Sequence, residues 1–167
     1  QAVLRGADLD GADLSTATLR GAVLERASMQ KATLGALDLR GCLLDDADLS
    51  GAQMGGCVLE GVSALRANLQ GASLRCAALP KARLDAADLR GADLRATQWL
   101  DATALRARLD GARLDGAALA GADLRGTDLS GVSAKHVDLS NGRLDGALLR
   151  GTDFTGAKLH RVGDAGV

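Results

Sequence analysis

A period of five residues runs through this chain from its first residues to its last. From Leu4 to Leu159 an apolar residue recurs at every fifth position, 32 times in unbroken register, and 25 of the 32 are Leu. Two positions before each of them stands a small residue, which is Ala in 22 of 32 cases. We call these the core position and the small position. Such a repeat constrains the fold strongly, because every unit must solve the same packing problem.

The five-residue spacing does not suit an α-helix. Five helical residues advance by about 500°, so successive core residues would form no apolar stripe. In an extended strand the small and core residues of one unit share a side, but the next small residue would face outward. The chain must therefore turn after every unit. Gly stands two positions after the core residue in 17 units, where a tight corner favours it. Four such corners close a coil of 20 residues.

Units such as Ala7-Asp8-Leu9 and Ala87-Asp88-Leu89 resemble those of the pentapeptide-repeat family, which are summarised as A(D/N)LXX. The resemblance covers essentially the whole chain. It implies an all-β fold, a right-handed quadrilateral β-helix (pentapeptide-repeat solenoid), here of about eight coils. We predict a single domain over residues 1–160 and a C-terminal tail over residues 161–167. Because the first residue is Gln rather than Met, we also expect a fragment of a longer protein.

The charge is nearly balanced overall but not along the chain. The formal net charge of −1 favours neither a polyanion nor a polycation as partner. Residues 1–60 hold nine acidic and five basic side chains, whereas residues 61–113 hold five acidic and nine basic ones. Direct nucleic-acid binding is not expected, because the basic middle has almost no aromatic residues to stack on bases. No apolar run reaches the length of a membrane span, so no membrane partner is expected either.

Cysteine usage indicates a reducing compartment. The chain has three cysteines, Cys42, Cys57 and Cys76, which form no CxxC pair and are too few for a disulfide scaffold. We predict a cytoplasmic protein, or one delivered into a target cell if the chain is part of a secreted effector. Cys42 and Cys57 occupy small positions and should behave as buried apolar residues. Cys76 falls at a corner and is the only thiol that we expect to react.

No pattern in the sequence indicates an enzyme. The chain has no phosphate-binding loop, no dinucleotide fingerprint and no HExxH or GxSxG motif. Its two histidines, His136 and His160, fall at outward or corner positions and should be solvated. The Asp before many core residues, as at Asp88, recurs with the repeat, so we expect it to cap nearby backbone amides rather than to act as an acid or bind calcium. We predict no catalytic residue, no metal site and no cofactor.

Departures from the repeat on the outside of the rod are the candidate interfaces. Val3, Val23 and Leu43 replace the usual Asp on one face in three successive coils and should form an apolar ladder. Arginines gather in the middle of the chain, and the candidate contacts there are Arg75, Arg95 and Arg113. An acidic patch is expected around one corner, formed by Glu25, Asp45, Asp46 and Asp48. The ordinary alternative for each group is a solvated surface.

The resemblance implies a non-enzymatic protein–protein interaction module. Some members of the family bind a type II topoisomerase, either DNA gyrase or topoisomerase IV, by presenting an acidic rod of DNA-like width. The near-neutral charge of this chain argues against such mimicry along the whole rod. The alternative is a structural or docking domain of a larger bacterial protein, a secreted effector or a multidomain protein. Its partner would then be a flanking domain of the same protein.

Overall fold

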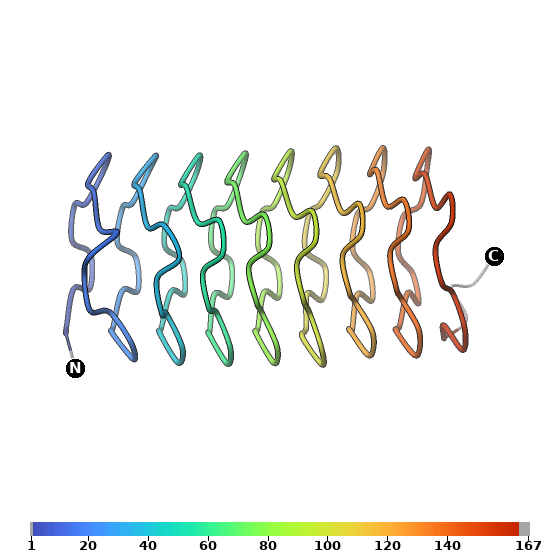
Figure 1. Ribbon diagram of the computed structural model, residues 1–167, viewed down its shortest axis with the longest axis horizontal. Coiled ribbons are helices and arrows are strands. Elements are labelled where there is room, and N and C mark those ends of the chain that lie inside the picture. The colour runs from blue at the N-terminus through green and yellow to red at the C-terminus, as the bar shows by residue number, and fades with distance from the viewer. Residues whose placement is uncertain (1, 164–167) are drawn as a thin grey trace.

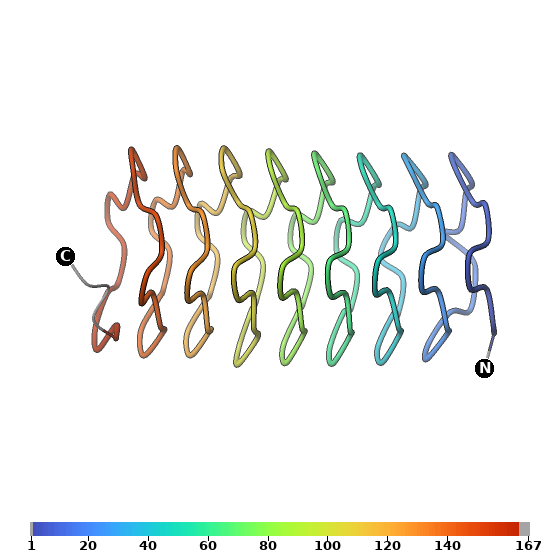
Figure 2. The same ribbon diagram turned by 180° about the vertical axis from the view of Figure 1, so that it is seen from behind.

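The computed structural model describes residues 2–163, which form one rod of stacked coils with the two chain ends at opposite ends (Figure 1). Figure 2 shows the same stack from behind. Each coil takes 20 residues, because every β-bridge joins residues 20 positions apart, as in Val3–Val23 and Val23–Leu43. All of these bridges are parallel. The chain is the right-handed quadrilateral β-helix that the repeat predicts, with eight coils between Val3 and Gly163.

The bridges fall into four columns, and each column defines one face of the rod. Face 1 runs from Val3 to Gly163, face 2 from Asp8 to Leu148, face 3 from Asp13 to Asp153, and face 4 from Asp38 to Lys158. Each strand is a single bridged residue, and residues 2–163 contain no longer strand and no helix. The bridged residue stands between the small and core residues, so its side chain points outward while theirs point in. The four columns therefore carry much of the outer surface.

The hydrogen bonds of one regular unit, residues 87–91, show what the repeat requires. The amide of Ala87 donates across the preceding corner to Leu84 O (3.0 Å), and three further amides donate to carbonyls of adjacent coils at 2.7–3.2 Å. Only the amide of Arg90, which follows the core Leu89, is left for a side chain. Because an unpaired backbone amide is costly, a side-chain acceptor at the bridged position stabilises this point of the repeat.

The corners have the geometry of type II turns. In a regular corner the amide of the small residue bonds back to the preceding core carbonyl, and the residue before the small position has φ near +60°, as at Gly91 (64°). Glycine adopts this conformation freely, whereas an L-residue pays roughly 1–2 kcal/mol. Several corners nevertheless carry a side chain there, namely Arg26, Lys31, Asp46, Arg66, Cys76, Lys81, Ala86, Ala96, Asp101, Arg106, His136, Asn141 and Arg161.

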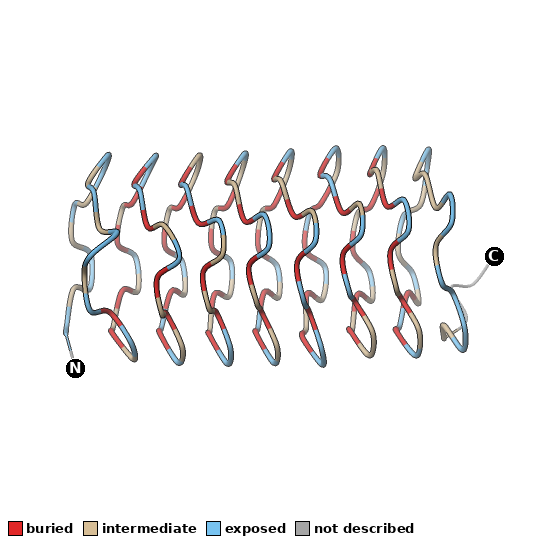
Figure 3. Ribbon diagram, viewed as in Figure 1, coloured by how far each residue is buried: buried red, intermediate tan, exposed pale blue. Residues whose placement is uncertain are grey.

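The core is one continuous apolar column enclosed by the four faces, as the inward-lying red segments in Figure 3 show. From Leu19 to Leu144 no core-position residue is more than 6% exposed. The large Trp99 fits because the next core position in the same coil is the small Ala104. Trp99 Nε1 donates to Thr97 Oγ1 (2.8 Å), so its only polar atom is satisfied inside the core.

Core positions are less well covered at the two ends of the rod than in its middle. Leu4 is only partly buried, and Leu159 is 47% exposed. Among the described residues these coils have a neighbour on one side only, so part of their apolar surface meets solvent. The bridge ladder continues to Gly163, three residues into the predicted tail. Residues 164–167 of that tail lie outside the described residues.

Two corners of one column depart from the regular geometry, since neither Thr16 nor Ala36 has a positive φ. In the second of them the positive φ occurs one residue earlier than usual, at Gly35 (55°), where a Cβ would lie 3.4 Å from Cβ of Ser15. Leu37, which follows, occupies a small position with only 6% of its surface exposed. Within residues 2–163 no bridge joins Thr18 to Asp38, so face 4 begins one coil later than the other faces.

Candidate functional site

Aspartates at the bridged positions are tied to their own backbone. Asp88 Oδ1 accepts the amide of Arg90 (3.3 Å), the amide that the bridge ladder leaves over. The Arg90 guanidinium folds back onto the same carboxylate, with Nε–Oδ1 and Nη2–Oδ2 distances of 2.8 and 2.7 Å. The same double contact recurs in the pairs Asp38–Arg40, Asp93–Arg95 and Asp123–Arg125. The expectation that these aspartates cap backbone amides is confirmed.

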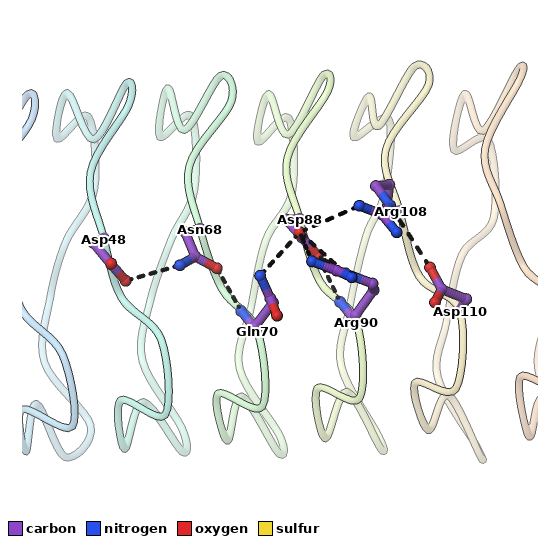
Figure 4. Close-up of polar contacts among 7 residues, drawn as sticks. All are labelled: Asp48, Asn68, Gln70, Asp88, Arg90, Arg108 and Asp110. Carbon is purple, nitrogen blue, oxygen red and sulfur yellow. Dashed lines mark hydrogen bonds and ion pairs between the residues drawn. The ribbon is translucent and has the colours of Figure 1, made fainter.

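On face 2 such contacts join into a polar ladder across four coils (Figure 4). Its members are Asp48, Asn68, Gln70, Asp88, Arg90, Arg108 and Asp110. Asn68 Nδ2 donates to Asp48 Oδ1 (3.1 Å), and Gln70 Nε2 donates to Asp88 Oδ2 (3.0 Å). Arg108 adds a longer ion pair to Asp88 at 3.9 Å. The ladder ties each coil to the next and leaves the Asp88 charge compensated.

The arginine partners keep these carboxyl groups ionised. The hydrogen bonds from Arg40 lower the pKa of Asp38 to about 2. Hydrogen bonds from Arg90 likewise lower the pKa of Asp88. The pKa of Asp93 and that of Asp123 are lowered in the same way by their paired arginines. A carboxyl group that stays ionised well below neutral pH is a poor proton donor, so these pairs are built for structure rather than for acid–base chemistry.

The predicted acidic patch is brought together in part, and two of its four charges have an arginine partner. Glu25 forms an ion pair with Arg5, and Asp46 forms a two-point ion pair with Arg66 at 2.7 and 2.8 Å. Asp45 accepts the hydroxyl of Ser63 (2.7 Å) and the amide of Leu65 (3.0 Å) in the next coil. The fourth member, Asp48, belongs to the face 2 ladder. An open groove of about 340 Å³ runs through this corner, lined by Arg5, Glu25, Arg26, Asp45, Asp46 and Arg66.

The predicted apolar ladder has the expected geometry. Val3, Val23 and Leu43 are bridged in sequence at the start of face 1. Val3 is 73% exposed and Leu43 is 37% exposed, so two of the three offer apolar surface to solvent. Their role as an interface stays a prediction.

The predicted arginine group lies on face 3 and is partly neutralised. Arg75 and Arg95 stand in one column, 20 residues apart, and Arg113 is bridged to Asp93. Arg95 is held by Asp93 through Nη2–Oδ2 and Nε–Oδ1 contacts of 2.5 and 2.7 Å. Arg75 and Arg113 are exposed. The two exposed side chains are therefore the ones available to a partner.

The cysteines and histidines lie as the repeat predicts. Cys42 and Cys57 are buried, and their thiols donate to Leu19 O and Gly35 O, both at 2.9 Å. Burial raises the pKa of Cys57 to about 11. Cys76 is exposed at its corner, as are His136 and His160.

Residues 2–163 contain neither a cluster of metal ligands nor a membrane-spanning helix. No three His, Cys, Asp or Glu side chains in this range gather in a way that would hold a metal ion. Nor does this part of the chain contain a helix long and apolar enough to cross a membrane.

The corner between faces 1 and 2 holds a second groove that sequence reasoning missed. It measures about 530 Å³ and is lined by Asp85, Ala86, Leu105, Arg106, Arg125, Gly126 and Asp145. The five-residue pattern alone marks the position before the small residue as a glycine corner and does not separate the four columns. Reading every twentieth residue from Arg26 to Arg106 shows an unbroken run without glycine.

The fold defines the chain as a β-solenoid, a rod built by stacking one short repeat. It belongs to the pentapeptide-repeat family: the family model for pentapeptide repeats matches it with 8 copies, over residues 1–35, 22–62, 66–97, 107–146 and 135–162. No curated protein sequence matches the chain significantly.

Solved structures of the same family resemble the chain. HetL, a pentapeptide repeat protein involved in heterocyst differentiation regulation in the cyanobacterium Nostoc, is 31% identical over 95% of this chain and 83% of HetL, with a TM-score of 0.38. A pentapeptide repeat protein of the Arabidopsis thaliana thylakoid lumen is 37% identical over 45% of this chain and 52% of that one, with a TM-score of 0.44. QnrB1, a plasmid-mediated fluoroquinolone resistance protein, is 22% identical over 92% of this chain and 77% of QnrB1, with a TM-score of 0.52. The likeness to QnrB1 is one of fold alone.

Proposed function

We propose that this chain is a non-enzymatic, cytoplasmic protein-binding module whose partner contacts side chains that depart from the repeat. One observation carries the proposal: the regular polar side chains are already engaged within the rod. Asp88 caps Arg90 and binds its guanidinium, and the same arrangement recurs on every face. The side chains left for a partner are the exposed exceptions, such as Val3 and Arg75.

A type II topoisomerase is the first partner to test, because some members of the pentapeptide-repeat family bind one. The binding would not depend on DNA mimicry. A DNA-like surface needs a continuous run of uncompensated negative charge, whereas Glu25, Asp46 and Asp88 all carry an arginine partner. We therefore expect contacts through the apolar ladder or the face 3 arginines.

Direct binding to purified DNA gyrase and topoisomerase IV tests this, together with inhibition of supercoiling. The first variant pair is Val3→Ser with Leu43→Ser, and the second is Arg75→Ser with Arg113→Ser. Since all four side chains are exposed, the fold should survive, which the thermal midpoint checks. We expect the parent chain to bind and one of the two variant pairs to weaken the affinity at least tenfold. The control Arg150→Ser should leave the affinity unchanged. The absence of both binding and inhibition at tens of micromolar would exclude topoisomerase as the partner.

A docking role within a larger protein is the second candidate, and the apolar ladder favours it. Val3 exposes most of its side chain at the edge of face 1, beside Val23 and Leu43. A flanking domain could cover this surface. The amides around residues 3–43 should then exchange hydrogen more slowly in a longer natural chain than the same amides do in the chain of residues 1–167 alone. Equal exchange rates in the two chains would contradict docking at this surface.

A further inference from the structure

The corner between faces 1 and 2, which we call the 1/2 corner, keeps side chains where glycine would be easier to accommodate. In five successive coils its left-handed position is occupied by another residue, with φ of 56–59°: Arg26, Asp46, Arg66, Ala86 and Arg106. The corner between faces 2 and 3 has glycine at this position in every coil except at Lys31. A run of strained positions points to a use for the side chains that they carry.

Two of these side chains differ from the others in being unpaired. Asp46 and Arg66 form an ion pair with each other, and Ala86 is apolar. Arg26 and Arg106 are exposed and make no ion pair or side-chain hydrogen bond within residues 2–163. They are therefore guanidinium groups available for an external carboxylate, with five donors each.

Each unpaired arginine lines one of the two open grooves of the 1/2 corner. Arg26 lines the groove of about 340 Å³, and Arg106 lines the groove of about 530 Å³. Leu65 and Leu105 are only partly buried in the adjoining column, and Leu105 lines the second groove. The corner thus presents a positive group towards each end with apolar side chains alongside.

We propose that the 1/2 corner binds an extended acidic–apolar segment of a partner protein, with carboxylates on Arg26 and Arg106 and apolar side chains against Leu65 and Leu105. Arg26 and Arg106 are four coils apart, roughly 19 Å at the spacing of stacked strands. An extended segment rises about 3.3 Å per residue, so its two acidic residues stand about six positions apart. The inference rests on the proposed function only in taking the partner to be a protein.

A protein segment fits this corner better than a nucleic acid does. The same corner carries Asp45, Asp85 and Asp145, which lie in the two grooves beside the arginines. A continuous phosphate backbone would bring a charge close to each of them. A peptide can place its carboxylates at the arginines alone.

The test is fluorescence anisotropy with the purified chain and labelled ten-residue peptides. The probes carry two Glu six positions apart with Leu and Val between them, and matched peptides carry Gln or Lys in place of both Glu. The variant chain combines Arg26→Gly with Arg106→Gly. Because both residues have positive φ, glycine should preserve or raise the thermal midpoint, so a loss of binding cannot be ascribed to unfolding. The matched control is Lys31→Gly, which removes one positive charge and the same backbone strain at the other corner.

We expect the Glu peptides to bind, and the Gln and Lys peptides to bind at least tenfold more weakly. The double variant should have an affinity for the Glu peptides at least tenfold lower than that of the parent chain. Lys31→Gly should bind within twofold of the parent chain. Undetectable binding at about 100 μM, equal binding of the Gln peptide, or an unchanged affinity of the double variant would overturn the proposal. So would duplex DNA that competes as strongly as the Glu peptide. If the peptides bind but topoisomerase does not, only the named partner is refuted. If topoisomerase binds but the peptides do not, only the role of the 1/2 corner is refuted.

Discussion

At the residue scale, the positive φ at the corner positions should affect the free energy of unfolding by an amount that can be measured. Ala86 has φ of 59° in an exposed turn, whereas Gly91 has φ of 64° with open space around its missing side chain. Ala86→Gly should raise the free energy of unfolding by about 0.5–1 kcal/mol, because relief of strain exceeds the added freedom of the unfolded chain. Gly91→Ala should lower it by about 1 kcal/mol.

Urea denaturation of the two variants and the parent chain measures both differences under one set of conditions. The pair is matched, since both residues lie in exposed turns of neighbouring units and neither substitution adds or removes a charge. A loss of stability in Ala86→Gly as large as that in Gly91→Ala would show that the two corners do not share the same backbone conformation.

The capping aspartates predict a loss of stability in acid. The pKa of Asp38 is about 2 in the folded chain, below the usual aspartate value of 3.8, and the pKa of Asp88 is lowered as well. A carboxyl group whose pKa is lowered in the folded state contributes its full stabilisation of the fold above its unfolded pKa. It loses that stabilisation as the pH falls through the folded pKa. The free energy of unfolding should therefore fall between about pH 4 and pH 2.

Denaturation curves at several pH values measure this slope, and Asp88→Asn provides its control. Asparagine can keep the amide cap, as Asn68 does by accepting the amide of Gln70 at 3.2 Å, but it carries no titrating charge. The variant should show a shallower acid slope than the parent. Stability that stays constant down to pH 2 would show that the aspartate–arginine pairs do not persist in solution.

At the scale of the element, the irregular turn before Leu37 can be tested by substitution. Gly35→Ala should destabilise the chain by about 1 kcal/mol, because φ of 55° strains an L-residue and the new Cβ would contact Ser15 at 3.4 Å. Hydrogen exchange should also quicken locally around Ser15 and Leu37. A variant as stable as the parent, with unchanged exchange at these residues, would contradict the described turn.

The sequence predicts the coil well and its irregularities poorly. The five-residue period places Leu89 inside and Asp88 outside without any knowledge of coordinates, because the register is the same in every unit. It does not show that the turns at Thr16 and Gly35 depart from the regular geometry, because the five-residue register continues through both without a break. Nor does it show that Asp46 binds Arg66, because charge pairing between coils depends on side-chain direction as well as position. The candidate surfaces were therefore predicted as groups, while the charge left on them was not.

At the scale of the whole molecule, many charges are paired between and within coils. The pair Arg66–Asp46 joins the basic middle to the acidic end, whereas Arg5–Glu25 lies within the acidic end, and Arg90–Asp88 and Arg95–Asp93 lie within the basic middle. A pair within one segment leaves the net charge of that segment unchanged. Arginines without an ion pair, such as Arg26, Arg75 and Arg106, stand at separate heights on the rod, which suits recognition of a particular partner more than general attraction to a polyelectrolyte.

The single-residue bridges between coils also govern how the rod responds to mechanical tension. Each coil is joined to the next by one bridged residue on each face and by shared apolar contacts, and bridges between more distant coils do not occur among the described residues. A pull on the two ends therefore loads the terminal coils first, and their core residues are the least covered, as at Leu4 and Leu159. We expect extension to proceed one 20-residue coil at a time, each releasing roughly 70 Å of chain. The rod should then lengthen in equal steps while its remaining coils stay folded.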